Sequence, residues 1–545
     1  MNRKMVGILV LTLLIATAVL PVVGTMNEKM DITALNIQQP TIEWEKTLGG
    51  DEFDYFRCIQ QTSDGGYIAF GEKEQDNMNY AWLLKLDANG NEEWSVVSQN
   101  LNGSTYDTVD LANVVIETSD GSYLACGLSE MYFSEYSMWA STGYLWKVDS
   151  SGETDWLNRY LDVSEEVEGL VPFNIIELDD GYIASGFAII VTGLEPLSYT
   201  LDGALFKTDV NGNLEWYKKY DGGRDQDVFN SLCITNDGGY FLSGASATFT
   251  VSESSFWMLK TDSEGTMQWE QMFSGPGADF SPVRGCGQTD DGGYIMCGMT
   301  ESYGAGKWDI WLIKTDGSGN KEWDSTFGGS GYDQTWSMQI LPEGGYIIGG
   351  VYNRMGFGIT QDDAWIIKTD TDGNAEWKYQ IEESGRQQIL FIVQTTDGGY
   401  IASGRTGEPD SKSTDAFIMK IGAFENDRPL QPSINGPSNG KPDIEYTFTT
   451  SATDPDGDSL SYMWDWGDGN FSEWLDTNEA TYTWTYEDNF EVRVMTEDEH
   501  GGESDWSDPL SFSTPKNKPY VNTPFLQFLE NHLHMFPLLR QLLDL

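Results

Sequence analysis

Five aspartates recur at one position of a repeated pattern, and their type and spacing make them the first candidates for chemistry. Each stands four residues after a glycine that precedes an apolar segment, and the set is Asp54, Asp107, Asp227, Asp279 and Asp333. If these segments line a central channel, the carboxylates form a partial ring at its mouth, which would suit calcium or a polyhydroxyl ligand. The alternative is that each carboxylate accepts hydrogen bonds from backbone N–H groups of the adjacent loop.

Aromatic residues in stretches of variable length form a second set of candidates. They are Tyr132, Phe133, Tyr136, Trp139, Trp308 and Phe357. Binding residues are often found in loops, where aromatic rings stack on sugars or anchor protein partners. The alternative is that these rings cover the ends of neighbouring strands as local packing.

Other catalytic chemistry has little support in the sequence. All three histidines (His500, His532 and His534) lie outside the repeated region, which excludes a histidine-based triad or a histidine-ligated metal there. The chain has no Gly-x-Ser-x-Gly elbow and no phosphate-binding Gly-x-x-x-x-Gly-Lys motif. Paired carboxylates, which hydrolyse glycosides, remain an alternative, but no pair among the 86 Asp and Glu stands out. We therefore predict no catalytic residue and no required cofactor.

The charge balance restricts the partners. The chain of 545 residues carries 31 Lys and Arg against 86 Asp and Glu, a net charge of −55. Phosphate binding requires clustered cations, so this balance argues against nucleic acid and against an anionic membrane surface. The expected partner is a glycan or a surface protein, and contact with a membrane is expected only through the two ends of the chain.

Seven repeats organise most of the sequence and predict the fold. Each contains an apolar strand, a turn of the type Asp-Gly-Gly-Tyr, a second apolar strand ending in Gly, and a third strand ending in Lys. A second turn then leads to a strand with a tryptophan. The tyrosines recur every 52 to 59 residues, at Tyr67, Tyr123, Tyr182, Tyr240, Tyr294, Tyr346 and Tyr400. Asp-Gly turns favour tight hairpins, so each repeat predicts a four-stranded propeller blade.

The seventh repeat lacks its last strand, and the N-terminal segment 42–50 supplies a matching one. The predicted fold is therefore all-β: a seven-bladed β-propeller over residues 41–422, closed by an N-terminal strand. The tryptophans of the repeat are expected to pack within the blades and have a structural role. They are Trp44, Trp94, Trp156, Trp216, Trp269, Trp323 and Trp377.

The repeat resembles the propeller repeats of archaeal and bacterial surface proteins. Its turn and tryptophan are also similar to the tryptophan-docking motif of quinoprotein-like propellers, which implies that each Trp packs between neighbouring blades. The quinone-binding groups of those dehydrogenases, including their adjacent cysteine pair, have no matching motif in this chain.

After a linker at residues 423–428, the chain carries a different signature. The motifs Asp454-Pro-Asp456-Gly-Asp458 and Trp464-Asp-Trp-Gly-Asp-Gly469 resemble those of the PKD (polycystic kidney disease) domain, over residues 429–515. The resemblance implies an immunoglobulin-like β-sandwich with an adhesion or spacer role. The alternating Asp454, Asp456 and Asp458 could hold calcium on a turn, or simply form a β-turn between strands.

The ends of the chain and its cysteines complete the organisation. Residues 1–24 are basic and then apolar, which is typical of a cleaved export signal or an N-terminal anchor. Residues 516–545 form an apolar tail, either a docking helix or a helix packed on the sandwich. Five cysteines are too few for a disulfide scaffold, but Cys286 and Cys297 are expected to face each other across a hairpin, as a disulfide or as buried thiols.

Together these features predict an exported binding protein of the cell surface or extracellular space. The loop face of the propeller would hold a glycan or a protein, and the sandwich would act as a spacer. A carboxylate-dependent polysaccharide hydrolase or lyase is the main alternative, and a structural envelope component is the third.

Overall fold

The computed structural model describes residues 41–514, apart from short internal gaps, together with residues 524, 527, 528 and 531. The gaps are 51, 76–77, 99–107, 134–137, 162, 164–166, 195–196, 249–253, 282–283, 354–361, 382–385, 408–412, 424–427, 456–457 and 499–501. The predicted leader 1–24 and most of the predicted tail lie outside the described residues. The chain divides into two compact units, described over 41–423 and 428–514. None of the described residues belongs to a helix long and apolar enough to cross a membrane.

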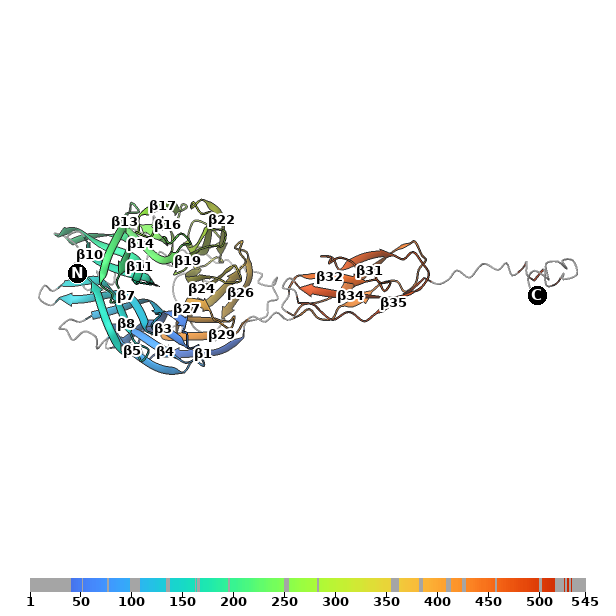
Figure 1. Cartoon of the computed structure of the whole chain (residues 1–545), viewed down its shortest axis with the longest axis horizontal. Coiled ribbons are helices and arrows are strands. Elements are labelled where there is room, and N and C mark those ends of the chain that lie inside the picture. The colour runs from blue at the N-terminus through green and yellow to red at the C-terminus, as the bar shows by residue number, and fades with distance from the viewer. Residues whose placement is uncertain are drawn as a thin grey trace. The chain divides into compact units, whose positions relative to one another are not determined.

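The first unit is the predicted seven-bladed propeller, with its antiparallel blades arranged around a common centre (Figure 1). The first three blades comprise β2 (Asp54–Gln61), β3 (Tyr67–Gln75), β4 (Met78–Leu86) and β5 (Glu92–Val97); β6 (Thr108–Glu117), β7 (Tyr123–Phe133), β8 (Met138–Val148) and β9 (Thr154–Tyr160); and β10 (Val167–Leu178), β11 (Gly181–Leu194), β12 (Leu197–Thr208) and β13 (Leu214–Tyr220).

The next three blades include one irregular member, the fifth, in which two short segments, β18 and β19, share the innermost position. They comprise β14 (Gln226–Ile234), β15 (Tyr240–Ala247), β16 (Ser254–Thr261) and β17 (Met267–Phe273); β18 (Asp279–Phe280), β19 (Cys286–Gln288), β20 (Tyr294–Thr300), β21 (Asp309–Thr315) and β22 (Lys321–Phe327); and β23 (Gln334–Ile340), β24 (Tyr346–Asn353), β25 (Asp362–Thr369) and β26 (Ala375–Ile381).

The seventh blade joins the two ends of the propeller and confirms the predicted closure. It contains β27 (Arg386–Gln394), β28 (Tyr400–Gly407), β29 (Asp415–Ile421) and β1 (Ile42–Leu48). Strand β1 pairs antiparallel with β29, with Trp44 opposite Lys420. The N-terminal strand therefore covers the edge of β29 that would otherwise be left unpaired.

The first hairpin of six of the seven blades is fixed by an aspartate. In the first blade Gly65 has a φ of 84°, which glycine adopts without steric cost. The Asp64 carboxylate accepts hydrogen bonds from the Thr62 hydroxyl and the Gly66 N–H, and pairs with Lys85 Nζ at 2.9 Å. The same pairing recurs in five other blades at 2.6–3.0 Å: Lys147–Asp120, Lys207–Asp180, Lys260–Asp237, Lys314–Asp291 and Lys420–Asp397. The repeated Lys is thus a structural residue that ties the third strand to the first turn.

The repeated tryptophans lie between neighbouring blades. The Trp94 ring packs against Tyr123 of the next blade at 5.7 Å, and its indole N–H donates to the Ser150 carbonyl at 3.0 Å. A Cβ added to Gly152, which has a φ of 87°, would lie 2.8 Å from the Trp94 ring. The same contact with a turn glycine of the next blade involves Trp44, Trp156, Trp216, Trp269 and Trp323, and Trp377 packs on Tyr400. Most of these rings are partly exposed, so they join the blades from their outer edge.

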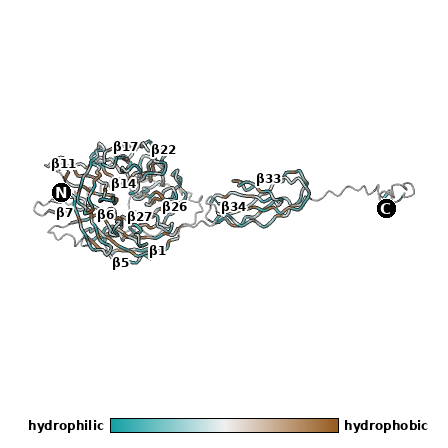
Figure 2. Tube along the Cα trace, in the orientation of Figure 1, coloured by the Kyte–Doolittle hydropathy of each residue, from teal (hydrophilic) through white to brown (hydrophobic). Residues whose placement is uncertain are grey.

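The second unit is a β-sandwich of two three-stranded sheets. One contains β30 (Ser433–Asn435), β31 (Glu445–Ser451) and β33 (Glu479–Thr483), and the other β32 (Leu460–Asp465), β34 (Asn489–Asp498) and β35 (Leu510–Ser513). Its core is aromatic, with Trp464, Trp484 and Phe512 fully buried. Figure 2 shows hydrophobic stretches on the strands of both units. The structure confirms the predicted immunoglobulin-like class.

Candidate ligand site in the propeller channel

The repeated aspartates turn their carboxylates to the backbone. Asp54 accepts hydrogen bonds from the N–H groups of Gly50 and Glu74, both at 3.1 Å, and Asp333 accepts them from Gly329 at 2.6 Å and Asn353 at 2.9 Å. All these carboxylates are buried. This geometry is the backbone-capping alternative rather than a ring of open ligands.

The other members of the set are held in the same way. Asp227 accepts from Gly222 at 2.6 Å, and Asp279 accepts from Gly275 at 2.6 Å. Burial raises the pKa of Asp227 and of Asp333 to about 6. Within the described part of the chain, no group of three or more His, Cys, Asp or Glu residues is arranged to hold a metal ion.

In the second blade the equivalent position belongs to a different aspartate. Asp107 lies outside the described residues, whereas Asp110 stands thirteen residues before the blade tyrosine, as do Asp54, Asp227 and Asp333 in their blades. Asp110 is buried and accepts a hydrogen bond from the Ser129 hydroxyl at 2.5 Å. Counting back from the blade tyrosine therefore selects Asp110 at this strand position, whereas counting from the preceding glycine selects Asp107.

The aromatic candidates are described only in part. Trp308 is buried, its ring packs edge-on against Phe280 and Tyr332, and its indole N–H donates to Glu301. It therefore has the local packing role that was the alternative. Tyr132 pairs with Trp139 across β7 and β8. The side chains of these two residues and of Phe133, and the whole of Tyr136 and Phe357, lie outside the described part.

The calcium candidate of the sandwich lies between β31 and β32. The Asp454 carboxylate accepts a hydrogen bond from the Asp458 N–H at 3.3 Å, and Asp456 lies outside the described residues.

The cysteine expectation requires a correction. Cys286 stands opposite Met296, one residue from the predicted Cys297, and neighbouring residues of a strand point to opposite faces. All five cysteines are free. The Cys286 thiol instead lies beside that of Cys233 on β14.

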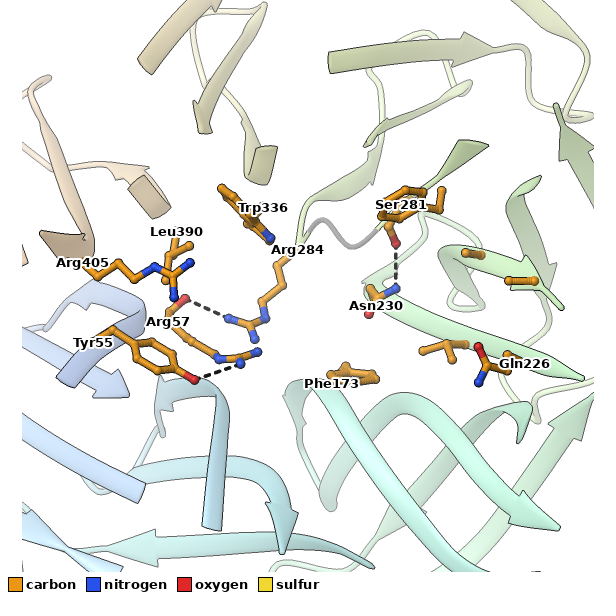
Figure 3. Close-up of a pocket in the computed structure, with 14 residues that line it drawn as sticks. Tyr55, Arg57, Phe173, Gln226, Asn230, Ser281, Arg284, Trp336, Leu390 and Arg405 are labelled. Carbon is orange, nitrogen blue, oxygen red and sulfur yellow. Dashed lines mark hydrogen bonds between the residues drawn. The ribbon is translucent and has the colours of Figure 1, made fainter. Parts of the chain in front are cut away.

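A cavity of about 210 Å³ lies at the centre of the propeller. We call the first strand of each blade its inner strand, and each inner strand contacts those of both neighbouring blades. Six of the seven blades contribute residues to the lining of this cavity. Its walls include three arginines and four aromatic rings: Arg57, Arg284, Arg405, Tyr55, Phe173, Phe280 and Trp336. All but Phe280 are labelled in Figure 3.

A repeated β-bulge aims side chains at this cavity. In the first blade Phe56 pairs with Gly71 and Cys58 with Phe70, so Arg57 has no cross-strand partner. A bulge inserts an extra residue and redirects its side chain. The same irregularity occurs in five other inner strands. We name the residues at this position the bulge ring: Arg57, Asn113, Phe173, Asn230, Trp336 and Leu390, with Arg284 at the equivalent place of the fifth blade.

A glycine within the second strand, four residues after the blade tyrosine, makes this bulge compatible with the sheet. A Cβ added to Gly71 would lie 1.9 Å from the Tyr55 carbonyl oxygen, and one added to Gly404 would lie 1.8 Å from that of Gln388. Only a residue without a side chain tolerates such an approach. The glycine four residues after each blade tyrosine therefore marks the bulge on the opposite strand.

Three arginines gather on one side of the cavity (Figure 3). Arg284 donates to the Arg57 carbonyl oxygen at 2.8 Å and to Asn113 Oδ1 at 3.3 Å. Arg57 donates to the Tyr55 hydroxyl at 3.0 Å, and its guanidinium carbon lies 5.3 Å from the centre of that ring. The guanidinium carbon of Arg405 lies 6.0 Å from the same ring. Tyr55 thus holds two of the guanidinium groups near each other.

These cations have few anionic partners. Arg57 Nε lies 3.4 Å from Glu72 Oε1, whereas Arg284 and Arg405 form no ion pair within the described chain. Arg405 instead donates to Gln388 Oε1 at 2.6 Å. Burial, together with the charge of Arg57, lowers the pKa of Arg284 to about 10, and burial also lowers the pKa of Arg405. The pocket is a positive site in a strongly negative protein.

Sequence reasoning missed this pocket, although a signal existed. The bulge ring residues stand ten residues before the blade tyrosine, except Phe173, which stands nine before Tyr182 because its hairpin is one residue shorter. Their types differ from blade to blade, so a search for repeated residues passes over them.

Comparison with known proteins identifies part of the second unit. A family model described as a PKD domain matches residues 426–512. A search of curated proteins found no match. Among solved structures, the chain is similar to the PKD domain of an M14-like peptidase from a Thermoplasmatales archaeon, with 34% identity over 17% of this chain and 100% of that one and a TM-score of 0.16.

Two further solved structures are similar to most of the chain. One is the extracellular domain of a B. thetaiotaomicron protein described as a hybrid two-component system, with 12% identity, 87% of this chain and 60% of that chain covered, and a TM-score of 0.37. The other is an α-L-arabinofuranosidase from Fusarium graminearum, with 11% identity, coverage of 71% and 98%, and a TM-score of 0.33. The strand topology described above and the family match at residues 426–512 together give a β-propeller followed by a PKD domain.

Proposed function

We propose that this chain is a non-catalytic binding protein of the cell surface or extracellular space, whose propeller takes a glycan into its central pocket. The observation that carries the proposal is the bulge ring. A backbone feature repeated around the propeller directs side chains of different types at one cavity. A binding site built on a repeat needs the same backbone in every blade and different side chains at the cavity.

The lining has the chemistry of a sugar site. Phe173 and Trp336 offer apolar faces from opposite parts of the ring, and aromatic faces stack on the C–H surfaces of sugars. Asn230 donates to the Ser281 carbonyl at 2.7 Å, which leaves its amide oxygen to accept a hydrogen bond from a ligand hydroxyl. A few placed polar groups among aromatic walls are typical of small-molecule pockets.

The alternative of a carboxylate-dependent hydrolase or lyase is less well supported by this pocket. Its described lining residues include no Asp or Glu. The nearby Glu72 carboxylate is buried behind Arg57 and accepts from the Ala112 N–H at 3.3 Å. A glycosidase needs two carboxylates on either side of the scissile bond, about 5–10 Å apart.

We further propose that the PKD domain acts as a spacer for display, as in the archaeal and bacterial surface proteins with quinoprotein-like repeats that the sequence resembles. Export through the N-terminal segment belongs to the same proposal. Binding in the pocket is proposed to require no cofactor, and calcium enters the experiment as a separate condition. A protein partner and a purely structural envelope role are the remaining alternatives.

A glycan array probed with the full mature chain, with and without calcium, tests this function. We expect selective binding that calcium leaves unchanged and that Trp336→Ala and Phe173→Ala each weaken. The matched control is Phe471→Ala, an exposed aromatic of the sandwich, which should bind as the wild type does. Binding that survives both pocket substitutions would place the ligand elsewhere, and absence of glycan binding would favour a protein partner or a structural role.

A further inference from the structure

We infer that the central pocket recognises an acidic sugar, whose carboxylate is held by Arg284 together with Arg57 and Arg405. The inference rests on the proposed glycan-binding function and specifies the class of ligand. It is carried by the position of three guanidinium groups on one side of a cavity whose other side is uncharged and mostly apolar, with a few polar groups (Figure 3).

The arrangement of the arginines leaves donors for a ligand. A guanidinium carries five N–H donors. Arg284 uses its Nη1 and Nη2 groups on the Arg57 carbonyl and on Asn113, and Arg405 uses Nε on Gln388. Arg57 Nε is buried 3.4 Å from Glu72 Oε1 and is not offered to a ligand, so the donors of Arg57 that remain are on its Nη groups. The bonds that do form fix the guanidinium planes, so the remaining donors are held in place for an anion.

The positive charge of the site also favours an anionic ligand. The chain has eleven arginines, and three of them line this one cavity. Arg57 has only Glu72 as an ion-pair partner, while Arg284 and Arg405 have none among the described residues. Burying cations without counterions costs free energy. A bound carboxylate would offset that cost, which gives an acidic ligand an advantage over a neutral one of the same shape.

The opposite wall indicates a sugar rather than a bare anion. Gln226 lines the cavity, is 6% exposed, and its amide has no hydrogen-bond partner in the described chain. Both its N–H₂ and its oxygen are therefore available to hydroxyl groups, beside the free amide oxygen of Asn230. Phe173 lies close by and offers a ring face (Figure 3). A ligand with a carboxylate at one end and hydroxyls at the other matches both walls.

Matched sugars test the inference by isothermal titration calorimetry on the full chain. The probes are galacturonic and glucuronic acid, with galactose and glucose as their neutral counterparts. We expect each acid to bind about tenfold or more tightly than its counterpart, and the advantage to shrink as salt is added. Arg284→Gln should reduce the acids to the affinity of the neutral sugars, and Arg284→Lys should retain only part of the advantage because lysine lacks the planar fork.

Two further variants make the test independent of folding. Arg405→Gln is the second pocket variant, and we expect the same loss of preference for the acids. The control Arg493→Gln removes an exposed arginine of the sandwich and should bind as the wild type does. The unfolding midpoint of each variant in urea shows whether it is folded.

The outcomes separate the two proposals. If acidic and neutral sugars bind equally and Arg284→Gln changes nothing, the inference is overturned while glycan binding stands. If inorganic sulfate or phosphate displaces the sugar acid and acetate does not, the pocket is built for a tetrahedral anion and the carboxylate assignment fails. If no sugar binds, both the inference and the proposed function are wrong.

Discussion

Replacing Asp227 with Asn tests whether the repeated carboxylates are buried caps or ligands of a cation. Burial raises the pKa of Asp227 to about 6, from an ordinary value of 3.8. The ionised form is therefore disfavoured in the folded state, and this cost is present above pH 6 and is relieved as pH falls. The shift corresponds to roughly 3 kcal/mol at pH 7 and to about half of that at pH 5. Asp227 alone should make the protein about 1 kcal/mol more stable at pH 5 than at pH 7.

Asp227→Asn should remove that contribution and keep the cap, because the Asn oxygen can accept from the Gly222 N–H that the carboxylate now binds at 2.6 Å. Urea unfolding followed by tryptophan fluorescence at the two pH values measures the free energy of unfolding. We expect the gain in stability between pH 7 and pH 5 to be about 1 kcal/mol smaller in the variant. The control Asp476→Asn, at an exposed position of the sandwich, should behave as the wild type does.

An unchanged pH dependence in Asp227→Asn would refute the burial argument. If calcium stabilises the wild type at pH 7 and not the variant, the carboxylate is a cation ligand, as the ring hypothesis holds.

The remaining predictions concern the elements that hold the blades together. Gly373→Ala should lower the free energy of unfolding by at least about 1 kcal/mol more than Gly238→Ala does. The two glycines have nearly equal φ values, 77° and 78°. A Cβ at Gly373 would lie 2.5 Å from the Trp323 ring, whereas a Cβ at Gly238 would have no atom within 4 Å. Equal losses in urea unfolding would show that the Trp contact does not restrict this site. Lys260→Met should cost about 1–3 kcal/mol, since Lys260 donates to Asp237 and to the Thr261 carbonyl. The Thr235 hydroxyl and Lys260 lower the pKa of Asp237 to about 2, so its stabilisation is present above pH 4 and lost as pH falls toward 2; this acid-induced loss should be smaller in Lys260→Met. Finally, Cys58 and Cys126 are fully buried, which raises the pKa of their thiols to about 11 and about 12, so iodoacetamide should modify neither in the native protein and all five cysteines after unfolding. A Cys286–Cys297 cross-linked peptide in the mass spectrum would contradict the strand register.

The fold could be predicted from the sequence because its determinants recur in phase. The Asp of the first turn, the Lys that pairs with it and the Trp of the fourth strand each have one structural partner that is the same in nearly every blade. In the first two blades these contacts are Lys85 with Asp64 and Trp94 with Tyr123. Closure was predictable for the same reason, since the segment around Trp44 matches the strand that the seventh repeat lacks.

Errors in strand register limited how well the candidate site residues could be predicted from the sequence. The prediction that Cys286 faces Cys297 was wrong by one residue, because Cys286 pairs with Met296. In the second blade, the sequence count selected Asp107 rather than Asp110. In a strand a shift of one residue reverses the face, and a loop of unknown length moves any position counted through it. Positions counted back from the blade tyrosine cross a hairpin of nearly constant length, and in the bulge ring they shift only at Phe173, by one residue.

The pocket could not be predicted from the repeat because the residues that repeat in every blade are not the residues that line the pocket. A repeat can be recognised only where the same side chain is required in every blade, as at Gly71 and Gly404, which face the bulges. Those glycines fix a backbone shape and leave the bulged residue opposite them without a cross-strand partner, so its identity is not needed for pairing. Arg57 and Leu390 can therefore occupy the same backbone position in adjacent blades. Function in such a scaffold is expected where the backbone repeats and the side chain does not, which is the opposite of the criterion that selected the aspartates.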